Sequence, residues 1–410
     1  MTVVSNLWNL ATRNLRQSGI LVAFVAIVIF FAVLNPNFLA PGNLTNIVLQ
    51  YSYILVLAIG MVIVIIAGHI DLSVGSVVAL TGAVAAVVVI RMDMPWWAGV
   101  IAALVVGIIV GAWQGFWVAF VGIPAFIVTL AGMLLFRGLT YLVLGSISLS
   151  PFGGTYYQIA NGFLNSMFGT VDLGSYAVGF AGLTFEFAIK FDVFTVAIFA
   201  IGVIGYAVWQ LRRRRAKFAY QQAVESMPLF VLKIVAVAIV VMWFGFQLAA
   251  SRGLPYVLII LAALIIAYTL LTQKTVFGRH VYAIGGNLNA AILSGVKVRK
   301  VNFWIFVNMG MLAAVAGVLF SARTNGAQPG AGNMFELDAI AACFIGGAAV
   351  TGGVGRVGGA IIGGLIMAVM SNGMQLMGVD QPTQQVVKGL VLLVAVAFDV
   401  WNKKRAARAA

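Results

Sequence analysis

Long apolar runs constrain this chain more than any other feature. A helix needs about 20 consecutive apolar residues to cross the hydrocarbon core of a bilayer. The chain is 63% hydrophobic and 8% charged, whereas soluble domains carry roughly 25% charged residues. We therefore predict an all-α, polytopic membrane protein with about 10–12 transmembrane helices. The predicted segments are 19–34, 44–67, 72–90, 97–120, 126–145, 191–210, 229–248, 255–272, 302–321, 337–350, 355–376 and 383–400.

The basic residues divide unevenly between the two sides of the membrane in this arrangement. Lys and Arg collect in cytoplasmic loops. With the N-terminus inside, seventeen basic residues fall on the cytoplasmic side, and only Arg91, Lys190, Arg252 and Arg323 fall outside. This bias predicts that both termini are cytoplasmic and that residues 150–190 form an outside loop. Segment 337–350 is short, so it either crosses the membrane or forms a re-entrant half-helix.

The formal net charge of +14 does not indicate nucleic-acid binding, because the basic residues lie at the ends of apolar segments. The densest cluster is Arg212–Arg215 with Lys217. Such clusters next to a membrane helix attract anionic lipid headgroups. We therefore expect membrane lipids, and no nucleic acid, as its partner.

The chain reads as one transmembrane domain, residues 1–410, made of two similar helical blocks. Residues 19–145 form the first block and 255–400 the second, with an insertion at 150–255 that holds the outside loop and extra helices. Within each block, an acid opens a glycine-rich apolar region: Asp71 in the first block, and Glu336 with Asp338 in the second. The topology puts Asp71 near the inside and Asp338 near the outside, as expected for inverted repeats with broken or re-entrant helices.

Asp71 is the acid that lies deepest in the apolar sequence, between two long apolar runs with almost no loop. Acids within membrane segments are candidates for a transport or binding pathway. The alternative is helix capping, in which Asp71 or Ser73 accepts hydrogen bonds from the first N–H groups of the next helix. Asp338 precedes a short helix, where the helix dipole favours an acid without any further function. Asp71, Ser73 and Asp338 are therefore pathway or broken-helix candidates.

A polar stretch at 274–300 interrupts the apolar sequence and carries five basic residues and no acid. It is predicted to be cytoplasmic. Residues 289–294 within it read as a short helix that ends at Gly295, because glycine readily adopts the left-handed conformation after a helix. This helix is either a docking element or part of an ordinary basic loop.

The sequence carries no pattern for catalysis or for a cofactor. Its glycine-dense run at 346–359 matches neither a phosphate-binding loop nor a dinucleotide-binding loop. The single Cys343 and the two histidines, His69 and His280, do not form a metal-binding pattern. We expect no catalytic residue, cofactor or metal. Energy for uphill transport would come from an ion gradient or from a separate ATP-hydrolysing chain.

Three blocks in order, residues 68–76, 282–295 and 346–355, resemble the ribose/xylose-type permeases of bacterial ABC sugar importers. The chain is longer than ribose-type members, and its extra residues at about 150–250 resemble the xylose or multiple-monosaccharide branch. Where that family most often has glycine before Ile-Asp-Leu, this chain has His69.

The resemblance implies a multi-pass permease of the bacterial inner membrane that imports a monosaccharide, with a pentose such as xylose favoured. It also implies three protein partners: a cytoplasmic ATP-binding subunit, a periplasmic sugar-binding protein and a second permease copy. By analogy, the cytoplasmic loop couples to the ATP-binding subunit through Gly286, Asn287, Ala290, Ala291, Ser294 and Gly295. Two alternatives remain: an ion-coupled secondary carrier without an ATPase partner, and a membrane-embedded enzyme.

The predicted topology can be tested with single cysteines at Thr170 and Arg213, introduced after replacement of Cys343. An impermeant thiol reagent added to intact cells should label position 170 and leave position 213 unlabelled. The opposite labelling pattern would invert the orientation.

Overall fold

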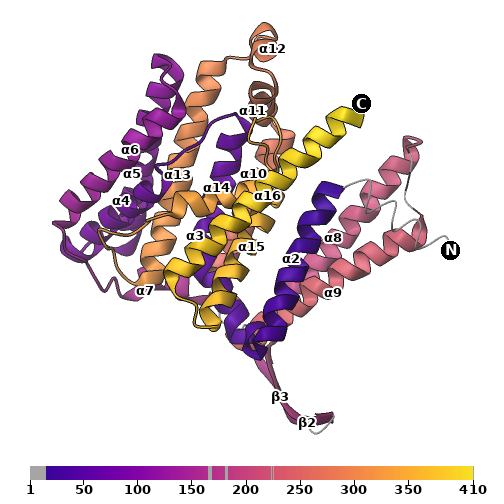
Figure 1. Cartoon of the computed structure of the whole chain (residues 1–410). Helices are drawn as coiled ribbons and strands as arrows, with labels where there is room; N and C mark the ends of the chain where they lie inside the picture. Colours follow the sequence, from indigo (N-terminus) through magenta and orange to yellow (C-terminus); the bar gives the residue numbers. More distant parts are fainter. Residues whose placement is uncertain (1–14, 165–168, 181–182, 223, 225, 410) are drawn as a thin grey trace. The chain divides into compact units, whose positions relative to one another are not determined.

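The computed structural model describes residues 15–164, 169–180, 183–222, 224 and 226–409. Fifteen α-helices occur in these ranges, which confirms the predicted all-α class (Figure 1). In chain order they are α2 (Leu15–Leu34), α3 (Pro41–Ile66), α4 (Val74–Ala86), α5 (Trp96–Phe116), α6 (Ala125–Leu144), α7 (Gly154–Asn161), α8 (Val193–Ala219), α9 (Met227–Ser251), α10 (Tyr256–Lys274), α11 (Val276–Gly286), α12 (Leu288–Leu293), α13 (Val298–Thr324), α14 (Phe335–Ile345), α15 (Val357–Leu376) and α16 (Gln381–Ala409).

Within the described residues, nine helices are long and apolar enough to cross a membrane. They correspond to nine of the twelve predicted segments, and Gly19–Leu34 forms a shorter apolar helix. The predicted segment 337–350 folds as α14, which has 11 residues. A helix rises 1.5 Å per residue, so α14 is too short to cross about 30 Å of hydrocarbon.

The chain divides into two compact units. The first contains Met1–Phe38, Ile47–Asn161 and Val257–Ala410, and the second contains Leu39–Asn46 and Gly162–Tyr256. The second unit therefore covers most of the region 150–255 that the sequence sets apart as an insertion.

Glycines allow the helices of the first unit to pack with their backbones in contact. A methyl group at Gly310 of α13 would lie 2.8 Å from the Cα of Gly111 on α5, and one at Gly363 of α15 would lie 2.7 Å from the backbone nitrogen of Gly346. Small residues are enriched at membrane helix interfaces because they permit such close approach. These close approaches occur where glycines of α5, α13 and α15 face neighbouring backbone.

Helix α3 forms the centre of the first unit. Its most apolar stretch is 89% buried, and every residue from Ile54 to Ile66 is buried. Cys343 of α14 lies with its Sγ 3.5 Å from the carbonyl oxygen of Ala58, and Leu55 packs onto Gly364 of α15. Helices α5 and α6 have much more exposed surface, with 28% and 33% of their apolar windows buried.

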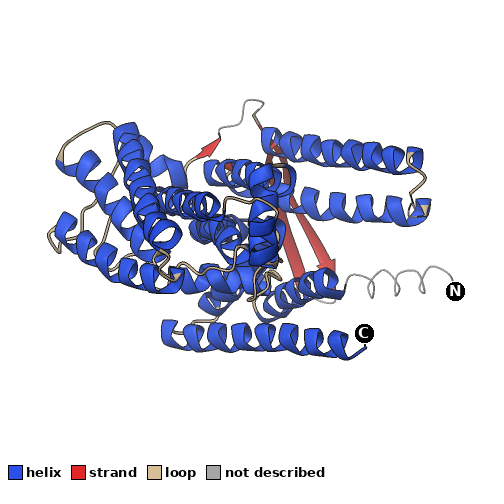
Figure 2. Ribbon diagram, turned by 90° about the horizontal axis from the view of Figure 1, so that it is seen from above, coloured by secondary structure: helices blue, strands red, loops and turns tan. Residues whose placement is uncertain are grey.

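The second unit is built on the helices α8 and α9, which pack side by side (Figure 2). Asp192 is the N-cap residue of α8, and its Oδ2 accepts a hydrogen bond of 2.9 Å from the backbone nitrogen of Thr195. Strand β1 (Phe163–Leu164) pairs with β4 (Leu254–Pro255) in this unit.

The outside loop predicted at 150–190 contains a β-hairpin, which the sequence analysis did not predict. Strand β2 (Thr170–Phe180) pairs in antiparallel with β3 (Leu183–Asp192). The sequence 183–192 alternates apolar with polar or small residues, and this period of two is typical of a strand. The pattern is short and lies between long helical runs, which explains why hydropathy alone missed it.

Candidate functional site

A non-helical segment at 67–73 separates α3 from α4; Ala67, Asp71 and Ser73 in it are buried, and Gly68 is exposed. Asp71 within it is 1% exposed and Ser73 is fully buried. The Oδ1 of Asp71 accepts hydrogen bonds from the backbone nitrogen of Ser73 at 2.9 Å and from its Oγ at 2.6 Å. The Nε2 of Gln114, on α5, donates to the Oγ of Ser73 at 2.5 Å. The carboxylate of Asp71 therefore fixes the position of Ser73, the residue directly before α4.

This geometry refines the capping alternative for Asp71. Ser73 is the N-cap residue of α4, but its side chain makes no capping hydrogen bond. Asp71 instead accepts from the N–H of the N-cap residue itself, as in an Asx turn. His69 of the same segment lies with its ring centroid 5.9 Å from that of Phe306. A helix break of this kind is stable within a membrane only where protein surrounds it.

A second break precedes α14. Met334 has a left-handed φ of 65°, and Glu336 and Asp338 lie in the first turn of the helix. The Nζ of Lys388, on α16, lies 3.2 and 3.3 Å from the two carboxylate oxygens of Asp338. Both side chains of this ion pair are partly exposed, at 20% for Lys388 and 22% for Asp338. The sequence did not predict this pair, although an acid and a base placed within apolar segments favour mutual pairing.

The two breaks meet at the starts of α4 and α14. A methyl group at Gly75 would overlap the carbonyl oxygen of Gly332 and the Oε2 of Glu336. Arg137 of α6 donates to the carbonyl oxygen of Ala331 and, at 3.4 Å, to that of Pro329. The predicted separation of the two sites to opposite sides is therefore wrong for the helix starts. Segment 67–73 is a partly buried connection, and α4 begins among other helices, since residues 74–83 are all buried.

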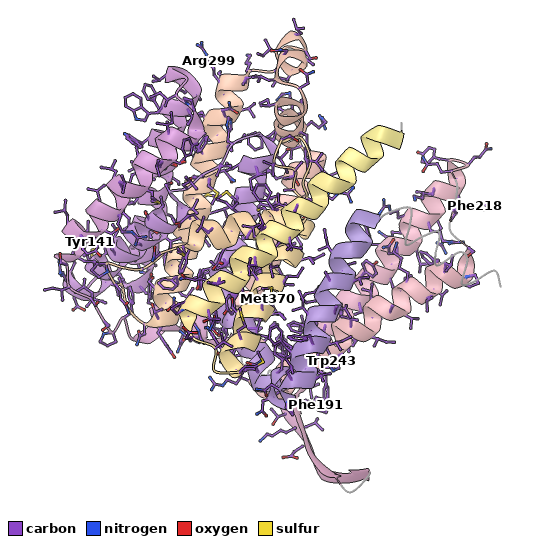
Figure 3. The ribbon with its side chains drawn as sticks, viewed as in Figure 1. Tyr141, Phe191, Phe218, Trp243, Arg299 and Met370 are labelled. Atoms are coloured by element: carbon purple, nitrogen blue, oxygen red, sulfur yellow. The ribbon has the colours of Figure 1, made fainter. Side chains whose placement is uncertain are left out.

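The predicted short helix in the polar stretch is α12. Asn287 caps it by accepting a hydrogen bond of 3.0 Å from the backbone nitrogen of Ala290. Gly295, with φ +81°, follows the helix in the left-handed conformation. Helix α12 lies at one end of the first unit, and Arg299, at the start of α13, lies at the same end (Figure 3).

The predicted coupling residues differ in accessibility. Gly286, Asn287, Ala290, Ser294 and Gly295 are exposed, whereas Ala291 is 4% exposed and faces the rest of the chain. The large side chains that α12 presents outward are apolar: Leu288 is 47% exposed, Ile292 53% and Leu293 88%. Leu288 and Ile292 are four residues apart and share one face of the helix. The exposed face of α12 therefore combines small and large apolar side chains.

The polar groups of the two breaks provide no set of ligands for a metal. Among the residues that the structure describes, no three His, Cys, Asp or Glu side chains come together in a way that could hold an ion. The chemistry that these groups can provide is hydrogen bonding and charge pairing.

Residues 43–396 match the family described as the permease component of the branched-chain amino acid transport system. The chain belongs to this family. It is 40% identical over 400 residues to the xylose transport system permease protein of Haemophilus influenzae, covering 97% of this chain and 100% of that protein. Identity to the Escherichia coli K12 xylose transport system permease protein is 37% over 397 residues, covering 97% and 94%.

The ribose import permease protein of Escherichia coli K12 is 32% identical over 391 residues, covering 95% of each chain. No solved structure matches the chain. The resemblance to ribose/xylose-type permeases is thus confirmed, and the chain is a multi-pass membrane transport subunit of that type.

The hydrogen bonds of Asp71 predict different effects for two substitutions. Asp71→Asn keeps an oxygen that can accept from Ser73, so we expect a near-normal melting temperature and near-normal transport. Asp71→Ala leaves the buried N–H of Ser73 without its acceptor, so we expect the free energy of unfolding to fall by about 1–3 kcal/mol. Thermal unfolding of the purified permease and sugar uptake in cells are the measurements.

The exposed Asp93 provides the control, because Asp93→Asn should change neither stability nor uptake. If Asp71→Asn abolishes uptake while its melting temperature stays normal, the charge itself acts in transport and capping does not explain the residue.

Proposed function

We propose that the chain is the membrane-spanning permease of an ATP-driven importer that moves xylose from the periplasm to the cytoplasm of a bacterium. The observation that carries this proposal is the likeness to permeases of xylose transport systems at 40% and 37% identity over 97% of the chain. Identity to a ribose permease is lower, at 32%, which favours xylose over ribose.

The permease needs three protein partners in this proposal. A cytoplasmic ATP-binding subunit binds α12, a periplasmic sugar-binding protein delivers the sugar, and a second copy of the permease completes the membrane part as a homodimer. Large exposed apolar side chains on α5 and α6, such as Ile109 (61%) and Leu134 (69%), leave surface for a second copy and for lipid. Both termini and the cluster Arg212–Lys217 are cytoplasmic, in accordance with the distribution of basic residues.

The two helix breaks form part of the transport pathway in this proposal. Transporters often bind substrate where discontinuous helices from two repeats meet. Here the start of α4 meets the start of α14, and α4 packs against α6 as α14 packs against α16. The correspondence between the pair α4–α6 and the pair α14–α16 supports the predicted inverted repeats. Asp71 and Ser73 stabilise one break, and Asp338 with Lys388 flanks the other.

Helix α12 binds the ATP-binding subunit through its exposed face. The accessible candidates from the sequence are Ala290 and Ser294, and the structure adds Leu288, Ile292 and Leu293 beside them. Ala291 packs inward, so in this proposal its small size serves the attachment of α12 to its own chain. A leucine that is 88% exposed outside the membrane-spanning helices favours a protein partner, because exposed apolar patches mark interaction sites.

Reconstitution tests the proposed function. The permease is placed in liposomes with a candidate ATP-binding subunit, and a candidate sugar-binding protein is added with labelled xylose. We expect uptake that requires ATP and both partners, and no ATP hydrolysis by the permease alone. Uptake that needs no ATP-binding subunit and collapses when the ion gradient is removed would establish a secondary carrier instead. Uptake of ribose but not xylose would correct the substrate.

The proposed docking face predicts the effect of a charge at Leu293. Burying a leucine contributes about 1.5–3 kcal/mol, so Leu293→Asp should weaken binding of the ATP-binding subunit by at least roughly tenfold. The permease should still insert and melt normally, because this side chain contacts little of its own chain. Co-purification of the ATP-binding subunit is the measurement.

Phe218 provides a matched control, since it is 76% exposed at the end of α8 and lies in the other large predicted cytoplasmic loop (Figure 3). Phe218→Asp should leave binding unchanged. If Phe218→Asp abolishes binding and Leu293→Asp does not, the docking site lies in the 212–222 loop.

A further inference from the structure

Three backbone segments that are far apart in sequence meet beside α11. The last residue of α3, Ile66, accepts a hydrogen bond of 2.8 Å from the backbone nitrogen of Gly353. A methyl group at Gly285 of α11 would overlap the carbonyl oxygen of Ile66 and would lie 2.6 Å from the nitrogen of Gly353. One at Gly353 would lie 2.8 Å from the Cα of Gly286. We call this contact of Ile66, Gly285 and Gly353 the glycine junction.

The three atoms that a methyl group would meet first are backbone atoms both at Gly285 and at Gly353. Gly353 has φ +74°, a conformation that glycine adopts without strain. The hydroxyl of Tyr282, one turn before Gly285 on α11, donates to the carbonyl oxygen of Gly355 at 2.7 Å. Burial raises the pKa of Tyr282 and the nearby Arg356 opposes this rise, so the hydroxyl keeps its proton. Helix α11 is thus attached to the 346–356 connection at two points.

On one side, the junction is joined directly to α12. Helix α11 ends at Gly286, and Asn287 is both its C-cap and the N-cap of α12. A single residue therefore separates the helix that carries Gly285 from the proposed docking helix, and Ala291 holds α12 against the chain. A displacement of α12 cannot be absorbed by a long flexible loop, and it moves the end of α11.

On the other side, the junction leads to both helix breaks. Ile66 directly precedes the 67–73 segment and is five residues before Asp71. Gly353 belongs to the connection between α14 and α15, and Asp338 lies on α14. Close-packed backbone transmits displacement because it has low compressibility. The glycine junction therefore links the proposed docking helix to the two elements that hold the pathway residues.

We propose that Gly285 is a positioning residue for transport: it passes the movement of α12 to the end of α3 and to the 346–356 connection, so that ATP hydrolysis is converted into rearrangement of the helix breaks. This inference deepens the proposed function and rests on it. A side chain at position 285 separates the three segments while leaving the exposed face of α12 intact.

The test measures sugar transported per ATP hydrolysed in the reconstituted importer. Gly285→Ala should still bind the ATP-binding subunit and hydrolyse ATP, but the ratio of sugar moved to ATP hydrolysed should fall by roughly tenfold, the scale of typical coupling between distant sites. Gly358→Ala is the matched control, because Gly358 is exposed near the same connection and a methyl group there meets no atom within 4 Å. It should keep the wild-type ratio.

Tyr282→Phe tests the same attachment of α11 in case Gly285→Ala does not fold. It removes the hydroxyl that donates to Gly355 and keeps the ring. It should also lower the ratio, by a smaller factor, with an unchanged melting temperature. A merely structural role would lower hydrolysis and uptake together at a constant ratio. The inference is overturned if both variants fold and keep the wild-type ratio of sugar moved to ATP hydrolysed. It is also overturned if Gly285→Ala does not fold and Tyr282→Phe keeps the wild-type ratio. If the wild-type importer hydrolyses no ATP during uptake, the proposed function fails, and the inference fails with it.

Discussion

The need to satisfy backbone hydrogen bonds away from water governs this structure. A continuous helix meets that need by itself, but a break within a membrane requires partners from the surrounding protein. At the first break, Asp71 accepts from Ser73, whose hydroxyl also accepts from Gln114. At the second break, Arg137 donates to carbonyl oxygens of the segment before α14. These partners come from α5 and α6, so both breaks depend on the helices around them.

The helix breaks also require glycine, because they bring backbone segments into direct contact with one another. Gly75 and Gly332 let the starts of α4 and α14 touch, and Gly285 and Gly353 let α11 reach the end of α3. A side chain at any of these four positions would meet backbone atoms, which cannot rotate away. The same packing that stabilises the breaks therefore makes them sensitive to displacement of α11 and α12. Stability and the proposed coupling depend on the same contacts.

Hydropathy predicted the helices well, because each must supply about 20 apolar residues to a bilayer. Local signals also predicted α12, through a small helical run ending at Gly295. The contact of Gly75 with Gly332 and the ion pair of Asp338 with Lys388 could not be predicted, since they join residues 257 and 50 positions apart. Helical periodicity around Ala291 was too short to reveal which side faces inward. The hairpin of β2 and β3 had a visible alternation that the surrounding apolar sequence obscured.

The acidic residues at the two breaks help to distinguish transport driven by an ion gradient from transport driven by ATP hydrolysis. A carrier driven by an ion gradient needs a carboxylate that is open to the ion in one state. Asp71 is 1% exposed and hydrogen-bonded to Ser73, and Asp338 is paired with Lys388. Asp71 and Asp338 thus each have a partner within this chain, which suits the passage of an uncharged sugar. In the proposed function, the free energy for uphill movement enters at α12, through a separate ATP-hydrolysing partner.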